Sequence, residues 1–297
     1  MKYQVMPITC IKYSLIIFGL YFLQFFAGES LFAQSNAVKV LTYNIRYASA
    51  GKAPEDWDLR KSDVMKAIKT VYPDVFGLQE ALHSQVLEME HAFPAYSQIG
   101  VGRDDGKEAG EYSPVFFRKD KYKLIDSGTF WLSDTPSVAG SRGWDAACNR
   151  IVSWAKLTDI KTKRPFVVFC THFDHIGQIA RRNSAKLLLH AIDSIAVKNP
   201  AIVLGDFNST PVSEPYLILI DIDNPKHLTD SEVVCKKVST NESTFYGFQV
   251  GGQVGERIDY IFIKNCNQVI DYHVNKTNNG TYYPSDHLPV DATILIK

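Results

Sequence analysis

The residues best suited to chemistry in this sequence lie where apolar runs end. Asp206 and Asn208 directly follow the run Val203-Leu204-Gly205. Side chains two residues apart on an extended chain point to the same side, so both groups can reach one cation or one phosphate. Taken alone, this pattern is more typical of a strand that ends in an Asx-rich turn. Only further polar strand ends can favour a functional site over a turn.

The same arrangement, a polar side chain at or next to the end of an apolar run, recurs along the chain. Its members are Asn44, Glu80, His172, Asp206, Asn208, Asp259, Asp286 and His287. Glu80 on its own is more typical of an acid that faces the N-terminus of a following helix. Structural caps do not account for two histidines and several carboxylates together. The oxygen-rich members suit a hard cation such as Mg²⁺, Mn²⁺ or Ca²⁺, and a histidine beside an aspartate can act as an acid–base pair.

The elements that must position these residues alternate between strands and helices. Apolar and β-branched runs predict strands over 38–44, 74–80, 96–101, 111–118, 122–131, 150–157, 166–170, 203–205, 256–263 and 291–296. Helical spacing predicts helices over 59–68, 81–90, 176–197 and 214–219. In the helix over 176–197 we expect Ile179, Leu187, Ala191 and Ile195 near one face. The chain is therefore predicted to be an α/β protein, and in open α/β sheets ligands bind beyond the strand ends.

The N-terminus has the layout of a secretory signal peptide. Lys2 and Lys12 precede an apolar run over 15–23, and small residues follow. A membrane anchor is the alternative, but Gln24 interrupts the run, which is shorter than the roughly 20 residues of a full span. We therefore expect residues 1–35 to be removed and the protein to be periplasmic, extracellular or on the cell surface. The remaining residues 36–297 are expected to form one catalytic domain with no stable membrane span.

Cysteine spacing and net charge restrict the partners. The cysteines that follow the signal peptide are widely spaced, and their disulfide pairing stays open: Cys148, Cys170, Cys235 and Cys266. They contain no C-x-x-C pair, and this disfavours a structural zinc site. The chain carries 32 basic and 32 acidic residues. Binding along a nucleic-acid backbone usually requires a basic surface, so nucleic acid is a possible but disfavoured partner. No oligomeric state follows from the sequence.

Six motifs in order resemble the endonuclease/exonuclease/phosphatase superfamily, which includes pancreatic-type deoxyribonuclease. They are Thr42-Tyr43-Asn44, Gly77-Leu78-Gln79-Glu80, Thr171-His172, Gly205-Asp206-Phe207-Asn208, Arg257-Ile258-Asp259-Tyr260 and Ser285-Asp286-His287. The resemblance covers essentially all of the chain after the signal peptide. It implies a four-layer α/β sandwich, in which two mixed β-sheets pack face to face with helices on the outside and the site lies at one edge.

The resemblance also implies roles for these residues. Glu80 becomes the principal metal ligand, helped by Asn44 and Asp286. Asp206 and Asn208 hold the attacking water, the phosphate or a second ion. His287 is the acid–base or phosphate-contacting histidine whose other N–H is accepted by Asp259, and His172 is a second histidine that faces the phosphate.

The sequence signals for residues on the substrate side are less specific. Tyr112 and Arg150 align loosely with substrate-side positions of the superfamily, although a core tyrosine and a surface arginine are comparably expected. Asp174 and His175, together with Arg181 and Arg182, can bind a further anionic group, although a solvated helix face also explains the arginines. Phe245, Tyr246 and Phe248 can stack on a ligand or insert into lipid, but packing of their own loop is the default.

These observations predict an exported, divalent-metal-dependent phosphoesterase that hydrolyses a small or lipid-borne phosphoester by in-line attack of water. In-line attack builds negative charge on the phosphoryl and leaving oxygens, and a divalent cation with a protonated histidine stabilises that charge. One alternative is a secreted Mg²⁺-dependent endonuclease or exonuclease. An alternative of another class is a catalytically silent binding module on the same fold.

Overall fold

Two mixed β-sheets form the fold, and the computed structural model describes residues 1, 36–48, 52–235, 237, 243–252 and 255–296. In order across the first sheet, the strands are β11 (Gln268–Val274), β12 (Val290–Leu295), β1 (Ala37–Asn44), β2 (Val75–Gln79), β4 (Val115–Arg118) and β3 (Tyr96–Ile99). Across the second sheet they are β5 (Tyr122–Trp131), β6 (Ile151–Asp159), β7 (Pro165–His172), β8 (Ala201–Asp206), β10 (Asp259–Lys264) and β9 (Thr229–Asp230). The pairs β1–β2 and β7–β8 are parallel, whereas β2–β4 and β6–β7 are antiparallel.

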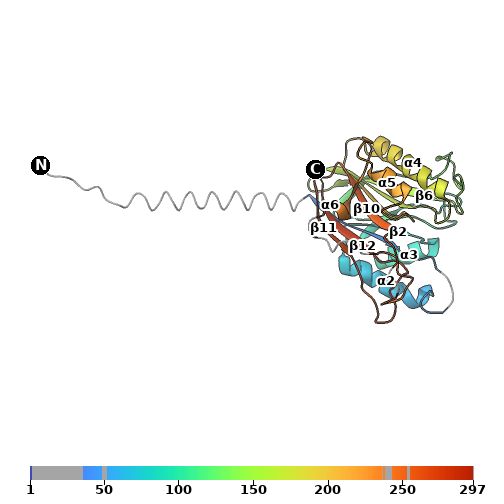
Figure 1. Cartoon of the computed structure of the whole chain (residues 1–297). Helices are drawn as coiled ribbons and strands as arrows, with labels where there is room; N and C mark the ends of the chain where they lie inside the picture. Colours follow the sequence, from blue (N-terminus) through green and yellow to red (C-terminus); the bar gives the residue numbers. More distant parts are fainter. Residues whose placement is uncertain (2–35, 49–51, 236, 238–242, 253–254, 297) are drawn as a thin grey trace. The chain divides into compact units, whose positions relative to one another are not determined.

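Helices cover the outer face of each sheet (Figure 1). The helices are α2 (Trp57–Val71), α3 (His83–Ala92), α4 (Gln178–Ala196), α5 (Glu214–Ile220) and the short α6 (Ser231–Val234). Apolar residues of α2 and α3 share one buried cluster with the first sheet, and those of α4 and α5 share another with the second sheet. A third cluster lies between the sheets and takes residues from both. The predicted four-layer sandwich is confirmed.

The two sheets pack closely around Gly77 of β2. A methyl group on Gly77 would lie 2.7 Å from Sγ of Cys170 on β7 in the other sheet. Real Cβ atoms do not approach a neighbour so closely, so a side chain here would push the sheets apart. The glycine of the Gly77-Leu78-Gln79-Glu80 motif is therefore required by packing, whereas the glutamate that ends the motif belongs to the site.

The alternation that builds the core also carries polar side chains to one end of the sheets. In β8, Ile202 and Leu204 face the layer between the sheets, and Asp206 continues the same face two residues further on. In β1, Asn44 follows Val40 in the same way. Asn44 Nδ2 donates to Asp206 Oδ2 at 3.0 Å, so the two sheets meet at this polar end.

Several predicted elements are confirmed with shifted bounds, and others differ. Residues 111–114 are not part of β4, and Arg257 precedes β10 instead of lying in it. Strands β9 and β11 and the helix α6 were not predicted. The signal peptide is predicted over residues 1–35, of which residues 2–35 lie outside the described ranges.

Two findings bear on the cysteines and on the membrane. Cys148, Cys170, Cys235 and Cys266 are all free thiols, so no disulfide joins the cysteines of the described ranges. Among the helices of those same ranges, none combines the length and the apolar character that a bilayer crossing needs.

Candidate active site

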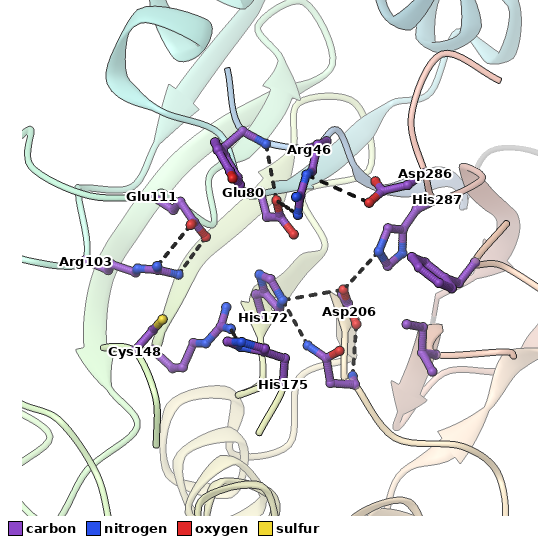
Figure 2. Close-up of a pocket in the computed structure, with 15 residues that line it drawn as sticks. Arg46, Glu80, Arg103, Glu111, Cys148, His172, His175, Asp206, Asp286 and His287 are labelled. Atoms are coloured by element: carbon purple, nitrogen blue, oxygen red, sulfur yellow. Dashed lines mark hydrogen bonds and ion pairs between the residues drawn. The ribbon is translucent and has the colours of Figure 1, made fainter. Parts of the chain in front are cut away.

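The polar strand ends surround one cavity of about 620 Å³ that opens to solvent (Figure 2). It is lined by Arg46, Tyr47, Glu80, Arg103, Glu111, Cys148, Arg150, His172, His175, Asp206, Asn208, Phe245, Ile258, Asp286 and His287. Asn44 and Asp259, both fully buried, support the lining from behind through hydrogen bonds to Asp206 and His287. A cavity of this size matches the pockets that hold small molecules.

A strained backbone turn aims Glu80 into the cavity. Phe76 and Leu78 of β2 face the helix layer, and a regular strand would point Glu80 the same way. Glu80 instead has φ of 61°, in the left-handed region that non-glycine residues rarely adopt, and its side chain lines the cavity. The alternative that Glu80 faces the N-terminus of the following helix does not hold, because α3 begins three residues later, at His83, and has no acidic residue in its first turn.

Glu80 and Asp286 converge on one positive charge. Glu80 Oε1 accepts a hydrogen bond from Asn44 Nδ2 at 3.1 Å, and its Oε2 lies 3.3 Å from Nη1 of Arg46. Oδ2 of Asp286 lies 3.9 Å from Nε of the same arginine. Burial opposes ionisation of Glu80, but the charges of Arg46 and His287 outweigh it and lower the pKa of this carboxyl. These oxygen donors, gathered around a cationic group, fit a hard divalent cation.

Arg60 holds the two loops that carry this part of the site, and the sequence did not indicate it. Its guanidinium is buried and donates to the backbone carbonyls of Ile45, Arg46, Tyr47 and Pro284. The first three follow β1, and Pro284 precedes Asp286. One buried side chain therefore fixes the loop of Arg46 against the loop of Asp286.

His287 lies between two carboxylates. Its Nδ1–H donates to Oδ2 of Asp259 at 2.8 Å, and its Nε2 lies 3.6 Å from Oδ2 of Asp206. Burial alone lowers the pKa of His287, but the charges of Asp259 and Asp206 raise it well above the ordinary value. Burial and the charge of Asp259 raise the pKa of Asp206 to about 7. A protonated imidazole beside a carboxyl of near-neutral pKa can move a proton at physiological pH.

His172 and Asn208 form the adjoining wall. Asn208 has φ of 46°, and its Nδ2 donates to Nε2 of His172 at 3.0 Å and to the carbonyl of Phe173 at 2.9 Å. Since Nε2 of His172 accepts this hydrogen bond, Nε2 carries no proton and the imidazole is neutral. Burial and the charge of Arg150 lower the pKa of His172 well below its ordinary value. His172 and His287 therefore have opposite protonation preferences.

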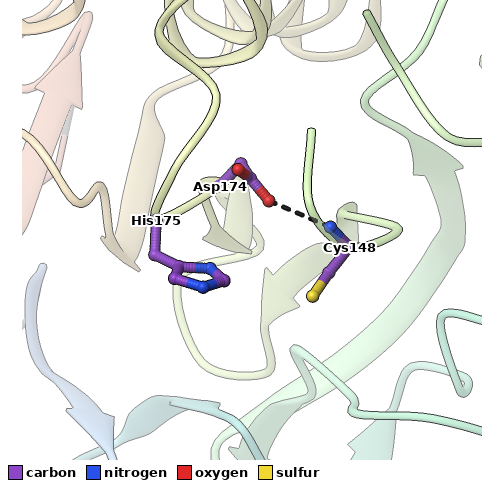
Figure 3. A group of neighbouring side chains, drawn as sticks. All are labelled: Cys148, Asp174 and His175. Carbon is purple, nitrogen blue, oxygen red and sulfur yellow. Dashed lines mark hydrogen bonds between the residues drawn. The ribbon is translucent and has the colours of Figure 1, made fainter. Parts of the chain in front are cut away.

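Three residues that the sequence placed on the substrate side lie outside the lining of this cavity. Tyr112 is buried, and its hydroxyl donates to the carbonyl of Lys107. Arg181 donates to the carbonyl of Asp174 and lines a separate cavity beside α4. Asp174 is 1% exposed and accepts hydrogen bonds from four backbone amides, those of Ala147, Cys148, Ile176 and Gly177. Figure 3 shows it directed at the loop of Cys148. Arg150 and His175 do line the cavity.

Asp174 is expected to contribute to stability through its charge. Burial raises the pKa of Asp174, but the four backbone hydrogen bonds together outweigh burial and lower this pKa from 3.8 to about 2. The fold thus favours the ionised form, so the contribution is complete above about pH 4 and is lost as the pH falls towards 2. We expect Asp174→Asn to lower the free energy of unfolding by roughly 2 kcal/mol at pH 7. Urea denaturation at pH 7, 5, 4 and 3 tests this, and a difference independent of pH contradicts it.

Other lining residues were missed. Arg46 and Tyr47 follow the predicted strand end at Asn44, and this proximity was the only available signal. Arg103 forms two hydrogen bonds with Glu111, of 2.6 and 3.0 Å, across a loop that was not predicted to fold back on itself. Phe245, which the sequence did single out as able to stack on a ligand, lines the cavity and packs edge-on against the ring of His287, with centroids 5.0 Å apart. Phe248 is buried against Arg60 and serves packing, as expected by default.

Comparison with known proteins identifies the family. Residues 41–287 match the Endonuclease/Exonuclease/phosphatase family. The chain belongs to this family. It is 39% identical to an endonuclease/exonuclease/phosphatase from Bacteroides vulgatus, with a TM-score of 0.82 over 88% of this chain and 99% of that one. It is 34% identical to a mannosyl-6-phosphatase from Bacteroides thetaiotaomicron, with a TM-score of 0.81 over 87% of this chain and 100% of that one.

A curated relative is more distant. Nocturnin from Drosophila melanogaster is 23% identical over 86% of this chain, and the chain spans 46% of the length of that protein. Members of the family are metal-dependent phosphoesterases and nucleases, and this chain is an enzyme of that class. At the cavity, Asp206, Asp259 and His287 place three possible ligand atoms within 4.8 Å of one another, a spacing that suits one metal ion.

Proposed function

We propose that this protein is an exported, Mg²⁺-dependent phosphoesterase that hydrolyses a small phosphomonoester by in-line attack of water. The observation that carries the proposal is the cavity of about 620 Å³. Around it lie both an oxygen-rich group, Glu80 with Asp286, and an acid–base group, Asp206 with His287. Phosphoester hydrolysis requires both groups in one cavity, because negative charge must be stabilised and a proton must be transferred at the same phosphorus.

Glu80, Asn44 and Asp286 are proposed to hold the cation, with Mn²⁺ or Ca²⁺ as alternatives to Mg²⁺. A divalent cation bound there supplies stabilisation of negative charge on the phosphoryl oxygens. Glu80 contributes an ionised carboxylate, since its pKa is lowered. Asn44 orients that carboxylate through its amide, 3.1 Å from Oε1 of Glu80.

The acid–base residues have separate proposed roles in proton transfer and phosphate binding. Asp206, whose pKa is raised to about 7, is placed to accept a proton from the attacking water, and Asn208 keeps its carboxylate in position through a backbone hydrogen bond of 2.9 Å. His287, held by Asp259, is the proton-carrying group that faces the phosphate. His172 is proposed to line the phosphate side of the cavity as a neutral ring, with its Nε2 held by the amide of Asn208.

The small phosphomonoester is favoured over other substrates by size, charge and similarity. The cavity matches the volume of small-molecule pockets, and the balance of 32 basic against 32 acidic residues does not suit a nucleic-acid backbone. The mannosyl-6-phosphatase from Bacteroides thetaiotaomicron, at 34% identity, is named for a sugar phosphate. These observations together favour a sugar phosphate over a lipid phosphoester or a nucleic acid.

A substrate panel tests the proposal. The purified protein is incubated with Mg²⁺, Mn²⁺ or Ca²⁺ and with p-nitrophenyl phosphate, bis-p-nitrophenyl phosphate, hexose 6-phosphates, sphingomyelin, plasmid DNA and RNA. We expect phosphate release from the monoesters, lost when EDTA removes the cation. Preferred cleavage of DNA or RNA supports the nuclease alternative instead. Absence of hydrolysis with every substrate and cation supports a silent binding module.

Export is proposed from the sequence of residues 1–35, with its two early lysines and apolar run. The expected product is a mature chain that begins near residue 36. Expression of the full chain, cell fractionation and N-terminal sequencing of the purified protein test this. An intact N-terminus on protein recovered from the cytoplasm contradicts it.

A further inference from the structure

One side of the cavity takes no part in the chemistry proposed above. We call it the distal wall, and it consists of Arg103, Glu111, Cys148, Arg150 and His175. Figure 2 shows Arg103, Glu111 and Cys148 on the left, with Asp286 and His287 on the right. The distal wall is therefore in place to contact the part of a substrate that lies beyond the phosphate.

The positive charges of the distal wall are neutralised within the protein. Nη1 and Nη2 of Arg103 donate to the two oxygens of Glu111, at 2.6 and 3.0 Å. Nε of Arg150 lies 3.5 Å from Oδ2 of the buried Asp174. Each guanidinium thus has its own carboxylate. A second phosphate bound here would lie beside the negative charge of Glu111, and no unpaired guanidinium of the distal wall would offset the repulsion. The distal wall is therefore poorly suited to a doubly phosphorylated substrate or to consecutive nucleotides.

The distal wall still offers hydrogen-bond acceptors and donors side by side. Each carboxylate oxygen can accept more than the one hydrogen bond that Arg103 supplies to it. Nη2 of Arg150 donates to Nδ1 of His175 at 3.0 Å, which leaves Nε2 of a neutral His175 ring as a donor. Burial raises the pKa of Glu111 despite the neighbouring Arg103, so donors from a ligand would offset the cost of burying this carboxylate.

We propose that the distal wall binds a neutral group with several hydroxyls, such as a sugar ring, attached to the phosphate. Hydroxyls both donate and accept, which matches a carboxylate beside a guanidinium and an imidazole. The inference rests on the proposed phosphoesterase function and adds to it the residues of that same cavity that contact the sugar. It assigns Glu111 as the residue that accepts from the hydroxyls and His175 as one that donates to them.

The test compares Glu111→Gln with the wild type on a hexose 6-phosphate, on p-nitrophenyl phosphate and on a hexose 1,6-bisphosphate. Loss of hydrogen bonds to a charged acceptor typically weakens binding about 10-fold or more. We expect the ratio of kcat/KM for the hexose 6-phosphate to that for p-nitrophenyl phosphate to fall at least about 10-fold, chiefly through KM. The bisphosphate should improve relative to the monophosphate, because Arg103 has lost its neutralising carboxylate.

Two further variants guard the result. Glu108 lies on the same loop as Glu111, and its side chain is 73% exposed. Glu108→Gln should therefore leave the ratio of the two kcat/KM values unchanged. His175→Ala, at an exposed position, should lower the same ratio even if Glu111→Gln folds poorly. An unchanged ratio in both Glu111→Gln and His175→Ala overturns the proposal, as does a wild-type preference for the bisphosphate.

A binding experiment separates this inference from the proposed function. Saturation-transfer NMR with a methyl hexopyranoside, which carries no phosphate, reports contact with the distal wall without any hydrolysis. We expect a signal with the wild type that is lost in Glu111→Gln, even if no phosphoester is cleaved. Absence of the signal from a wild-type protein that does cleave p-nitrophenyl phosphate contradicts the distal-wall assignment and leaves the phosphoesterase function standing.

Discussion

Glu80→Gln is expected to abolish phosphoester hydrolysis while the protein stays folded. The substitution preserves the shape of the side chain and the oxygen that accepts from Asn44, but it removes the negative charge that faces Arg46 and the proposed cation site. We expect kcat to fall by roughly 10³-fold or more, which corresponds to about 4 kcal/mol of lost transition-state stabilisation. Excess cation should not restore the rate, because the amide of Gln cannot supply the negative charge that the carboxylate of Glu80 supplies.

The measurement pairs kinetics with direct binding. Turnover of p-nitrophenyl phosphate is followed across a Mg²⁺ and Mn²⁺ series, and Mn²⁺ binding is measured by calorimetry. Circular dichroism and thermal melting confirm that the variant is folded. Glu90→Gln, on an exposed position of α3, is the matched control and should behave like the wild type. Near-normal turnover in a folded Glu80→Gln protein would remove Glu80 from the metal site.

The strand ends could be predicted from the sequence because they follow a period of two. In β8, Ile202 and Leu204 fix the inward face, and Asp206 has to continue it. The same reasoning places Asn44 at the end of β1. Residues 162 apart in the chain then meet in one hydrogen bond, because the two sheets pack face to face with the ends of β1 and β8 at the same end of the sandwich. Local sequence pattern and sheet geometry therefore account for the centre of the site.

Backbone turns and long-range clamps could not be predicted in this way. Strand alternation alone would send Glu80 towards α3, and only its left-handed φ reverses that direction. The sequence around Arg60 predicts an ordinary helix position. Its buried guanidinium nevertheless donates hydrogen bonds to four backbone carbonyls from two distant loops. Neither feature leaves a periodic signal, because each depends on where separate segments come together in three dimensions.

Neighbours in sequence were sometimes misleading. Asp174 lies two residues after His172, yet it turns away to cap backbone amides, since a short carboxylate readily bonds to nearby N–H groups. In α4 the buried stripe includes Ala180 and Leu188, whereas Ile179 is 45% exposed. The predicted face was offset by about one residue because the many apolar positions of this helix support more than one stripe.

The remaining large effect is expected from Asp259→Asn, which acts on His287. Burial alone lowers the pKa of His287, and Asp259 is the largest of the influences that raise it. The asparagine cannot supply that charge, although Thr244 still fixes the backbone at this position by accepting from the amide of residue 259. We expect kcat to fall by roughly 10²- to 10⁴-fold, the usual contribution of a positioned acid–base group.

The pH dependence of Asp259→Asn distinguishes loss of charge from loss of structure. If protonated His287 is the active form, wild-type activity falls as the pH rises through the raised pKa of this histidine. Without Asp259 that pKa drops, so the alkaline limb of the kcat profile should move to lower pH, with the residual activity best preserved in acid. Asp58→Asn, at a side chain 79% exposed on α2, should leave the profile in place. An alkaline limb at the wild-type pH in Asp259→Asn would assign that limb to a group other than His287, because the charge that holds the proton on this imidazole has been removed.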